Sequence, residues 1–524
     1  MFKNEPFTDF TIPSNRSNFE EALRALQARI EKEQLWAAPI VNGKEIESPE
    51  ISLRVDPSDP SVVVSRTKFA SLQDVDNALE YASNCADSWA KVPATDRSNI
   101  IKRAAQEMRS RRLELVAIII REAGKSWREA DADVAEAIDF CDYYAEEILR
   151  IAPPILTMEV AGEDNHYFYQ PRGVALIIAP WNFPLAIACG MAVAALVTGN
   201  PVILKPAEQT SYIAYELAKI LLKAGIPPGA FSFLPGYGEQ IGRKLVASPK
   251  VSLICFTGSR PVGLEILKAS AVVAPDQYHM KKVILELGGK NAIIVDEDAD
   301  LDEAVKGVIA SAFGFSGQKC SACSRVLVVG RAKDQFLPRL MEAAKDLIVG
   351  KSSEPATLLG PVIDEESQKR ILNVIADSER SFKPLFKGTV PKNGYFVPAT
   401  IFQDVAAESS LWREEVFGPV VAVRCVPSFE HAIKEANDCQ YALTGGVFSR
   451  SPAHLEQAKS DFKVGNLYLN RSCTGALVCR QPFGGFKLSG IGSKAGGKDY
   501  LLQFLEPRTV TENTMRRGFT PESK

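Results

Sequence analysis

From residue 174 onward, short apolar runs alternate with longer segments in which apolar residues recur at helical spacing. The first series of runs comprises residues 174–178, 202–204, 231–234 and 253–256. A second series begins near residue 291 and comprises residues 292–296, 325–329, 420–423 and 465–469. Strands that alternate with helices form parallel sheets covered by helices on both faces. The pattern therefore predicts two doubly wound α/β units.

Residues 1–150 have a different pattern, which predicts mainly helices. Capping boxes are expected at residues 17–20 and, with Asp in the place of Glu or Gln, at residues 71–74. A long helix is expected over residues 95–123, ending at Gly124, because glycine readily adopts the left-handed conformation that ends helices. A further helix is expected over residues 126–149. It contains three acidic residues, which taken alone indicate a solvated face.

The segment from residue 173 to residue 204 has no charged side chain and is long enough to span a bilayer. Pro180, Pro184 and the turn at residues 199–201 divide it into three short pieces. Two buried parallel strands that flank a buried helix have the same composition. We therefore expect no membrane span here.

Composition and charge limit the remaining classes of protein. A chain of 524 residues exceeds one normal core, so two or three domains are expected. A net charge of -3 gives no basic surface for nucleic acid or an anionic membrane. Ten cysteines without regular spacing indicate reduced thiols, and the N-terminus lacks a signal peptide, so the cytoplasm is expected. Cys320 and Cys323 form a CxxC, but no second pair follows and only four histidines exist, so no metal site is expected.

Three residues in separate motifs could together oxidise an aldehyde. Cys320 is the candidate nucleophile, because thiolate is strongly nucleophilic near neutral pH. The Asn182 side-chain amide and the Cys320 backbone N–H are candidate donors to the oxyanion that forms on attack. Hydride loss leaves a thioester, and Glu286 is the candidate base for the water that cleaves it. The joint occurrence of these residues predicts an enzyme that oxidises aldehydes through a thioester.

A second group of residues indicates a nucleotide cofactor. Gly258 and Ser259 follow a strand and open a helix, where backbone N–H groups can face a pyrophosphate, although the sequence is not GxGxxG. Lys205 and Glu208 follow another strand. A carboxylate at Glu208 can accept both ribose hydroxyls and would repel a 2′-phosphate, so NAD is favoured over NADP. Glu415 is a candidate for the second ribose.

Six motifs in a fixed order resemble those of the aldehyde dehydrogenase superfamily. They are Pro-Trp-Asn-Phe-Pro at 180–184, Lys-Pro-Ala-Glu at 205–208, Phe-Thr-Gly-Ser at 256–259, Glu-Leu-Gly-Gly-Lys at 286–290, Gly-Gln-Lys-Cys at 317–320 and Glu-Glu-Val-Phe-Gly-Pro at 414–419. Within it, the chain resembles the 1-pyrroline-5-carboxylate (L-glutamate γ-semialdehyde) dehydrogenases nearly end to end. The stretches that carry this narrower resemblance are residues 133–140, 317–322, 470–475, 482–490 and 494–497. The later part also resembles the C-terminal half of bifunctional proline-utilisation flavoproteins.

The resemblance implies three structural parts and a homo-oligomer. An NAD-binding domain of the Rossmann type would comprise residues 1–150 and 170–290, and a catalytic domain residues 291–490. A small β arm, made of residues 151–169 and 491–524, would join subunits by strand addition.

The resemblance also implies contacts for each ligand. The NAD-binding residues would be Ile178, Pro180, Trp181, Lys205, Ala207, Glu208, Gly258, Ser259, Val262, Leu287, Glu415 and Phe417. The α-carboxylate of the substrate would bind Ser321 and the backbone N–H groups of Gly496 and Gly497. Glu136 would lie near its ammonium group, while Phe183 and Phe504 would enclose its methylenes. Lys319 could favour the thiolate or an acidic substrate, with a lysine directed to the sheet edge or to solvent as the alternative.

These features predict an NAD-dependent enzyme that oxidises glutamate γ-semialdehyde, formed from 1-pyrroline-5-carboxylate, to glutamate in proline breakdown. Three alternatives stay open. The first is a dehydrogenase of another semialdehyde, such as succinate semialdehyde, which needs no partner for an ammonium group. The second is a CoA-acylating enzyme, in which Glu286 would have no use. The third is a domain that docks on a proline dehydrogenase and receives its product.

Overall fold

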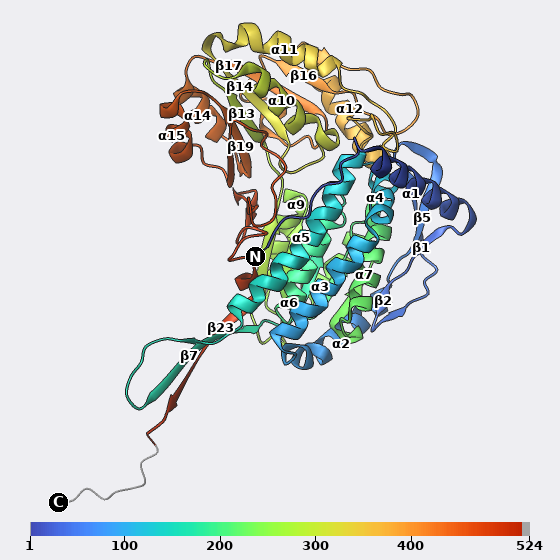
Figure 1. Cartoon of the computed structure of the whole chain (residues 1–524), viewed down its shortest axis with the longest axis vertical. Coiled ribbons are helices and arrows are strands. Elements are labelled where there is room, and N and C mark those ends of the chain that lie inside the picture. Colours follow the sequence, from blue (N-terminus) through green and yellow to red (C-terminus); the bar gives the residue numbers. More distant parts are fainter. Residues whose placement is uncertain (1, 516–524) are drawn as a thin grey trace, which may run out of the picture.

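Figure 1 shows the computed structural model, which describes residues 2–515. The larger of its two main sheets has five parallel strands at its centre. Its eight strands lie in the spatial order β22 (Gly490–Ile491), β12 (Lys282–Glu286), β11 (Val251–Thr257), β8 (Val174–Ile178), β9 (Val202–Lys205), β10 (Phe231–Phe233), β2 (Ile40–Val41) and β3 (Lys44–Glu45). The chain proceeds from β8 through β9 to β10 in one direction and continues on the other side with β11 and β12. A topological switch point therefore lies between β8 and β11, and ligands bind at such points beyond the carboxyl ends of the strands.

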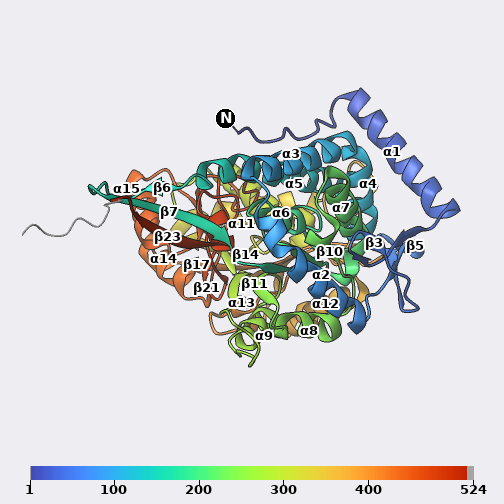
Figure 2. The same ribbon diagram turned by 90° about the horizontal axis from the view of Figure 1, so that it is seen from below.

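Helices cover both faces of this sheet because its strands are apolar on both sides. Ala175 and Ile177 pack in a core with α3 (Ala94–Ser110), α4 (Arg112–Ala123), α5 (Trp127–Ile151), α6 (Ala186–Val197) and α7 (Ser211–Ala224). Val174 and Leu176 face the opposite core with α2 (Leu72–Ala90), α8 (Arg243–Ala247) and α9 (Arg260–Ser270). Figure 2 shows the two layers. Successive side chains of β8 therefore pack alternately into the two cores, as predicted for a doubly wound unit.

The second sheet repeats this plan with seven strands. Their spatial order is β15 (Pro384–Lys387), β16 (Thr400–Gln403), β17 (Val420–Val426), β14 (Cys323–Val329), β13 (Asn291–Val295), β19 (Thr444–Phe448) and β20 (Asn466–Leu469), and β15 alone is antiparallel to its neighbour among these described strands. Ile293 and Val295 pack toward α10 (Leu301–Phe313) and α11 (Lys333–Lys345). Ala292 and Ile294 face α12 (Glu365–Glu379), α14 (Phe429–Asn437) and α15 (Pro452–Asp461), with the one-turn α13 (Ser410–Arg413) nearby. The prediction of two α/β units is confirmed.

The N-terminal part differs in detail from the prediction. α1 (Pro13–Lys32) begins four residues before Ser17, so the capping box expected at 17–20 is wrong, whereas the one formed by Ser71 and Asp74 is present. The helix expected over 95–123 is broken at Arg111 into α3 and α4, and α4 ends at Gly124 with φ 73°. A three-stranded sheet, which the helical prediction omitted, contains β1 (Leu35–Ala37), β5 (Asp59–Lys68) and β4 (Ile51–Asp56).

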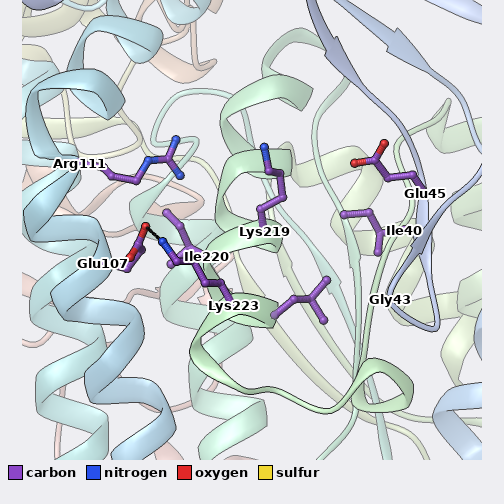
Figure 3. Close-up of a pocket in the computed structure, with 9 residues that line it drawn as sticks. Ile40, Gly43, Glu45, Glu107, Arg111, Lys219, Ile220 and Lys223 are labelled. Atoms are coloured by element: carbon purple, nitrogen blue, oxygen red, sulfur yellow. Dashed lines mark hydrogen bonds and ion pairs between the residues drawn. The ribbon is translucent and has the colours of Figure 1, made fainter.

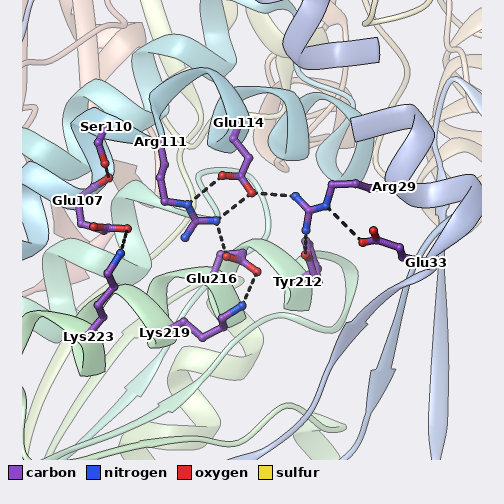
Figure 4. Close-up of polar contacts among 10 residues, drawn as sticks. All are labelled: Arg29, Glu33, Glu107, Ser110, Arg111, Glu114, Tyr212, Glu216, Lys219 and Lys223. Carbon is purple, nitrogen blue, oxygen red and sulfur yellow. Dashed lines mark hydrogen bonds and ion pairs between the residues drawn. The ribbon is translucent and has the colours of Figure 1, made fainter. Parts of the chain in front are cut away.

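The break at Arg111 lies at the centre of an ion-pair network among α1, α4 and α7 (Figure 4). Arg111 contacts Glu114 of α4 at 2.9 Å and Glu216 of α7 at 2.6 Å, and Arg29 of α1 contacts Glu114 at 2.8 Å. The network thus joins three helices that are distant in sequence. A surface cavity of about 500 Å³ beside it is lined by Ile40, Gly43, Glu45, Glu107, Arg111, Lys219, Ile220, Leu222 and Lys223 (Figure 3).

An antiparallel ribbon projects from the body of the molecule (Figure 1). β23 (Leu505–Asn513) pairs along its whole length with β7 (Glu163–Pro171), which also pairs with β6 (Ile155–Leu156). The arm expected from residue 491 starts later, because Gly490–Ile491 pairs with β12 and Leu501 is buried in the core under α5 and α6. The part of the expected arm beyond residue 515 lies outside the described residues. A two-stranded pair, β18 (Tyr441–Ala442) and β21 (Phe486–Lys487), completes the sheets described here.

The uncharged segment 173–204 forms β8, α6 and β9, so the strand–helix–strand prediction is confirmed. None of the helices within residues 2–515 is both long and apolar enough to cross a membrane.

Candidate active site

Cys320 lies in a tight loop between α10 and β14. Phe315, Ser316 and Gly317 all have left-handed φ values, of 48°, 54° and 70°. A Cβ on Gly317 would stand 2.2 Å from the carbonyl oxygen of Gly418, so this position requires glycine. The Asn291 side chain donates to the carbonyl oxygen of Cys320 at 2.7 Å. Strained backbone that the surroundings hold in place is typical of functional loops, and here it fixes the position of the thiol.

Glu286 ends β12 and lines the same cavity of about 700 Å³ as Cys320. Burial raises the pKa of Glu286 to about 8. Its Oε2 atom is buried and has no hydrogen-bond partner among the described residues. Burial, together with the charges of Glu415 and Glu286, raises the pKa of the Cys320 thiol to about 12. In the free protein both groups therefore mainly hold their protons at pH 7.

Asn182 is buried beside the segment that leads to Cys320. Its Nδ2 donates to the carbonyl oxygen of Gln318 at 3.0 Å, two residues before Cys320. This bond uses one of the two amide hydrogens, which leaves the other for a ligand. Asn182 does not line the cavity in this conformation, so its contact with an oxyanion stays a prediction.

Four of the residues predicted to bind substrate line the cavity with Cys320: Glu136, Phe183, Lys319 and Ser321. Burial and the charge of Asp133 raise the pKa of Glu136 to about 8. Lys319 is 9% exposed, and its Nζ pairs with Glu129 of α5 at 2.6 Å. The alternative of a lysine directed to solvent is therefore wrong.

The structure contradicts the other three substrate contacts. The N–H of Gly496 donates to the Tyr144 hydroxyl at 2.8 Å, and that of Gly497 donates to the carbonyl oxygen of Lys494 at 3.1 Å. Neither amide is available for a carboxylate. Phe504 is 0% exposed and packs on Tyr500, which itself lines the cavity. Phe504 is thus part of the core behind the wall.

A loop from an earlier part of the chain occupies the place that those residues were expected to fill. We call residues 471–477 the anchor loop; all of them except Cys473 line the cavity, together with Phe483. Gly475 has φ 76°, with open space where a Cβ would lie. Among the described residues, nothing accepts a hydrogen bond from the backbone N–H groups of Gly475 and Ala476. In the sequence, residues 470–475 and Phe483 served only as markers of the family resemblance. A glycine beside small residues was the available signal for a loop that approaches a ligand.

A buried ion pair, which no local pattern predicted, supports the part of the cavity wall that contains Phe183. Lys125 and Asp133 are both 0% exposed, with Nζ and Oδ2 at 2.8 Å. Asp133 also accepts from the N–H of Ala186, at the start of α6, at 2.7 Å. The Lys125 ammonium lies 3.8 Å from the centre of the Phe183 ring. The acids of α5 are therefore not all on a solvated face, and this pair fixes the aromatic wall.

The predicted cofactor residues gather at the carboxyl edge of the larger sheet. Ile178 ends β8, Lys205 ends β9, and Gly258 and Ser259 join β11 to α9. Pro180, Trp181, Ala207, Glu208, Val262 and Leu287 follow these strands. Lys205 Nζ contacts Glu208 Oε1 at 2.9 Å, and the same oxygen accepts from the N–H of Gly238 at 3.1 Å. These residues lie at the switch point, where a dinucleotide would bind.

The second domain supplies Glu415 and Phe417 to this edge. Glu415 Oε1 accepts from the N–H of Gly289 at 2.9 Å, and burial raises the pKa of Glu415 to about 7. A Cβ on Gly288 would stand 2.1 Å from the Glu415 carboxylate, so a side chain at this position would force the carboxylate to move. The Phe417 ring packs edge-on against Trp181 at 5.5 Å. Both parts of the chain thus contribute to one site.

Comparison with known proteins agrees with this geometry. A model of the aldehyde dehydrogenase family matches residues 47–510. The chain belongs to this family. It is 44% identical over 512 residues to a 1-pyrroline-5-carboxylate dehydrogenase of a Geobacillus species, covering 98% of this chain and 99% of that one.

Solved structures of aldehyde dehydrogenases have the same fold. A 1-pyrroline-5-carboxylate dehydrogenase from Thermus with bound NAD superposes with a TM-score of 0.95 at 44% identity, covering 98% of this chain and 99% of that one. Proline utilization A from Bdellovibrio bacteriovorus, inactivated by N-propargylglycine, gives 0.97 at 48% identity. All of this chain is covered in that match, but only 54% of the Bdellovibrio protein.

Proposed function

We propose that this aldehyde dehydrogenase oxidises L-glutamate γ-semialdehyde, the open form of 1-pyrroline-5-carboxylate, to L-glutamate with NAD as the oxidant. The observation that carries the proposal is one cavity that contains a thiol, a buried carboxyl group and groups for both charges of an amino acid. The names of the relatives at 44% identity and the NAD bound to the Thermus relative support it. The same step would follow the oxidation of proline.

The residues of the chain divide the reaction between them. Cys320 loses its proton to solvent and attacks the aldehyde carbon, and the oxyanion that forms accepts hydrogen bonds from the Asn182 amide and the Cys320 N–H. NAD, when bound, accepts the hydride that leaves this carbon. Glu286 in its ionised form then takes a proton from the water that attacks the thioester, which releases glutamate and regenerates the thiol.

The residues at the switch point fit NAD. The Glu208 carboxylate is partly exposed and stands beside Lys205, so it can accept hydrogen bonds from the two ribose hydroxyls while it repels a 2′-phosphate. The turn at Gly258 and Ser259 opens α9 and offers N–H groups to the pyrophosphate. Glu415 would hold the second ribose, beside Phe417.

The two charges of the substrate's amino-acid head would bind at different walls. The ammonium would lie near Glu136 of α5, and the carboxylate would bind Ser321 and the N–H groups of Gly475 and Ala476. Phe183 and Phe483 would enclose the methylenes, because short aliphatic chains need apolar walls. An aldehyde that lacks the ammonium leaves Glu136 without a partner, which disfavours succinate semialdehyde.

The arm supports a proposal of a homo-oligomer. β23 is at the edge of its three-stranded sheet, and eight of its nine residues are exposed. An exposed edge can add a strand from a second copy of the chain.

Because some similar chains are parts of longer proline-utilisation proteins, a proline dehydrogenase is the natural partner. All ten cysteines are free thiols, as expected in the cytoplasm.

The test follows NADH formation with 1-pyrroline-5-carboxylate, succinate semialdehyde and an unbranched aliphatic aldehyde, beside the variant Cys320→Ala. We expect a strong preference for the first substrate and no turnover in the variant. Equal rates with all three aldehydes would refute the substrate assignment but not the chemistry. Turnover by Cys320→Ala would refute the thioester route.

A further inference from the structure

The N-terminal segment forms part of the wall of the catalytic cavity. Five consecutive residues, Phe7 to Thr11, line it beside α5 and the anchor loop. We call residues 4–11 the N-terminal strap. Phe10 packs edge-on against Trp127 at 5.3 Å, which holds the far end of the strap at the start of α5. A segment more than 300 residues from Cys320 in sequence therefore borders the reaction site.

One attachment of the strap is at Asp131. The N–H and the hydroxyl of Thr8 both donate to the Asp131 carboxylate, each at 2.7 Å. Arg112 donates to the two oxygens of the same carboxylate at 2.8 Å and also pairs with Glu5 at 3.2 Å. Asp131 is only 1% exposed. Hydrogen bonds to charged groups are among the stronger ones, so this part of the strap is firmly held.

The other attachment joins the strap to the anchor loop. The Asn4 amide donates to Asp139 Oδ2 at 2.7 Å and to the carbonyl oxygen of Val478 at 3.0 Å. The N–H of Glu5 donates to the other oxygen of Asp139 at 2.6 Å. Val478 directly follows the anchor loop. Asn4 thus links the anchor loop to α5 through one side chain.

This link spans the two walls of the proposed substrate site. Asp139 lies three residues after Glu136 on α5, so the two carboxylates are on the same side of the helix. On the other wall, Val478 lies two residues after Ala476, whose N–H has no acceptor in the part of the chain described here. A shift of the anchor loop away from α5 would change the separation between the groups that bind the carboxylate and the ammonium.

We propose that Asn4 is a positioning residue that sets the distance between the anchor loop and Glu136, and with it the selectivity for aldehydes that carry an amino-acid head. The proposal rests on the proposed function. An aldehyde without such a head does not use both walls, so its binding does not depend on this distance. The chemistry at Cys320 and Glu286 is remote from Asn4 in sequence and has no hydrogen bond to it.

The first test compares Asn4→Ala and Asn4→Asp with Lys3→Ala, a variant of the exposed residue that directly precedes the strap. Asn4→Asp keeps the shape of the side chain but cannot donate, and it places a second carboxylate beside Asp139. We expect KM for glutamate γ-semialdehyde to rise about tenfold in both Asn4 variants, the effect of two lost hydrogen bonds, with kcat within about twofold of wild type. KM for propanal should not change, and Lys3→Ala should resemble wild type in all respects.

Amide hydrogen exchange of residues 471–478 gives a second measurement that needs no substrate. Exchange should be faster in Asn4→Ala than in wild type or Lys3→Ala, because the loop has lost its link to α5. Unchanged exchange would refute the link itself. Faster exchange with no change in KM, or with equal losses for both aldehydes, would refute the role in selectivity. A wild-type enzyme that does not prefer glutamate γ-semialdehyde would instead refute the proposed function, and the exchange result would still decide whether the link exists.

Discussion

Replacement of Glu286 by Gln should separate the two halves of the reaction. The amide keeps the size of the side chain but cannot take a proton from water, so hydrolysis of the thioester should slow while its formation continues. General-base catalysis contributes about 10²-fold to 10⁴-fold, and we expect the steady-state rate at pH 8 to fall within that range. Because burial raises the pKa of Glu286 to about 8, only about one tenth of it is ionised at pH 7 and about one half at pH 8. The active form thus increases as pH rises, and the loss caused by the substitution should grow about fivefold between these two pH values.

The assay is rapid-mixing measurement of NADH absorbance with saturating aldehyde. The Glu286→Gln enzyme should give a burst of one NADH per active site followed by a slow steady rate, because hydride transfer precedes hydrolysis. Glu354→Gln removes an exposed carboxylate and should behave as wild type. A Glu286→Gln enzyme that lacks the burst would refute the reasoning, since Glu286 would then act on Cys320 before the hydride leaves.

Three further predictions concern stability, backbone strain and the head group. Asp133→Asn removes the hydrogen-bonded counter-charge of the buried Lys125 and should lower the free energy of unfolding by about 3–5 kcal/mol, measured by urea denaturation. A loss below about 1 kcal/mol, the range of exposed pairs, would contradict a dry ion pair. Gly317→Ala should lower kcat/KM about 100-fold by displacing the Cys320 loop, and normal activity would refute the strain argument. The matched control is Gly388→Ala, where the nearest atom is 3.6 Å from the new Cβ. Glu136→Gln should raise KM for glutamate γ-semialdehyde but not for succinate semialdehyde, and an unchanged preference in the NADH assay would contradict the ammonium contact.

Local patterns predicted the strands well and brought the candidate cofactor residues to one sheet edge, because each depends on neighbouring residues. Apolar runs such as 174–178 are strands wherever the sheet is buried on both faces. Since parallel strands end at one edge, Lys205 and Gly258 had to meet there. The helix break at Arg111 escaped prediction because helical periodicity continues across it, and only the contacts of Arg111 with Glu114 and Glu216 distinguish that residue.

The sequence by itself determined the two α/β units and supplied the candidates for the nucleophile, the base and the nucleotide edge, because short motifs with fixed spacing carry this information. The tertiary structure alone decided which residues form the cavity wall. The family resemblance implied Gly496 and Phe504, but the N–H of Gly496 is already hydrogen-bonded and Phe504 is buried behind the wall, whereas Gly475 and Phe483 line the cavity. The strap contact between Asn4 and Val478 spans 474 residues. Side chains that are so distant along the chain meet only through the packing of the whole molecule, which no local pattern records.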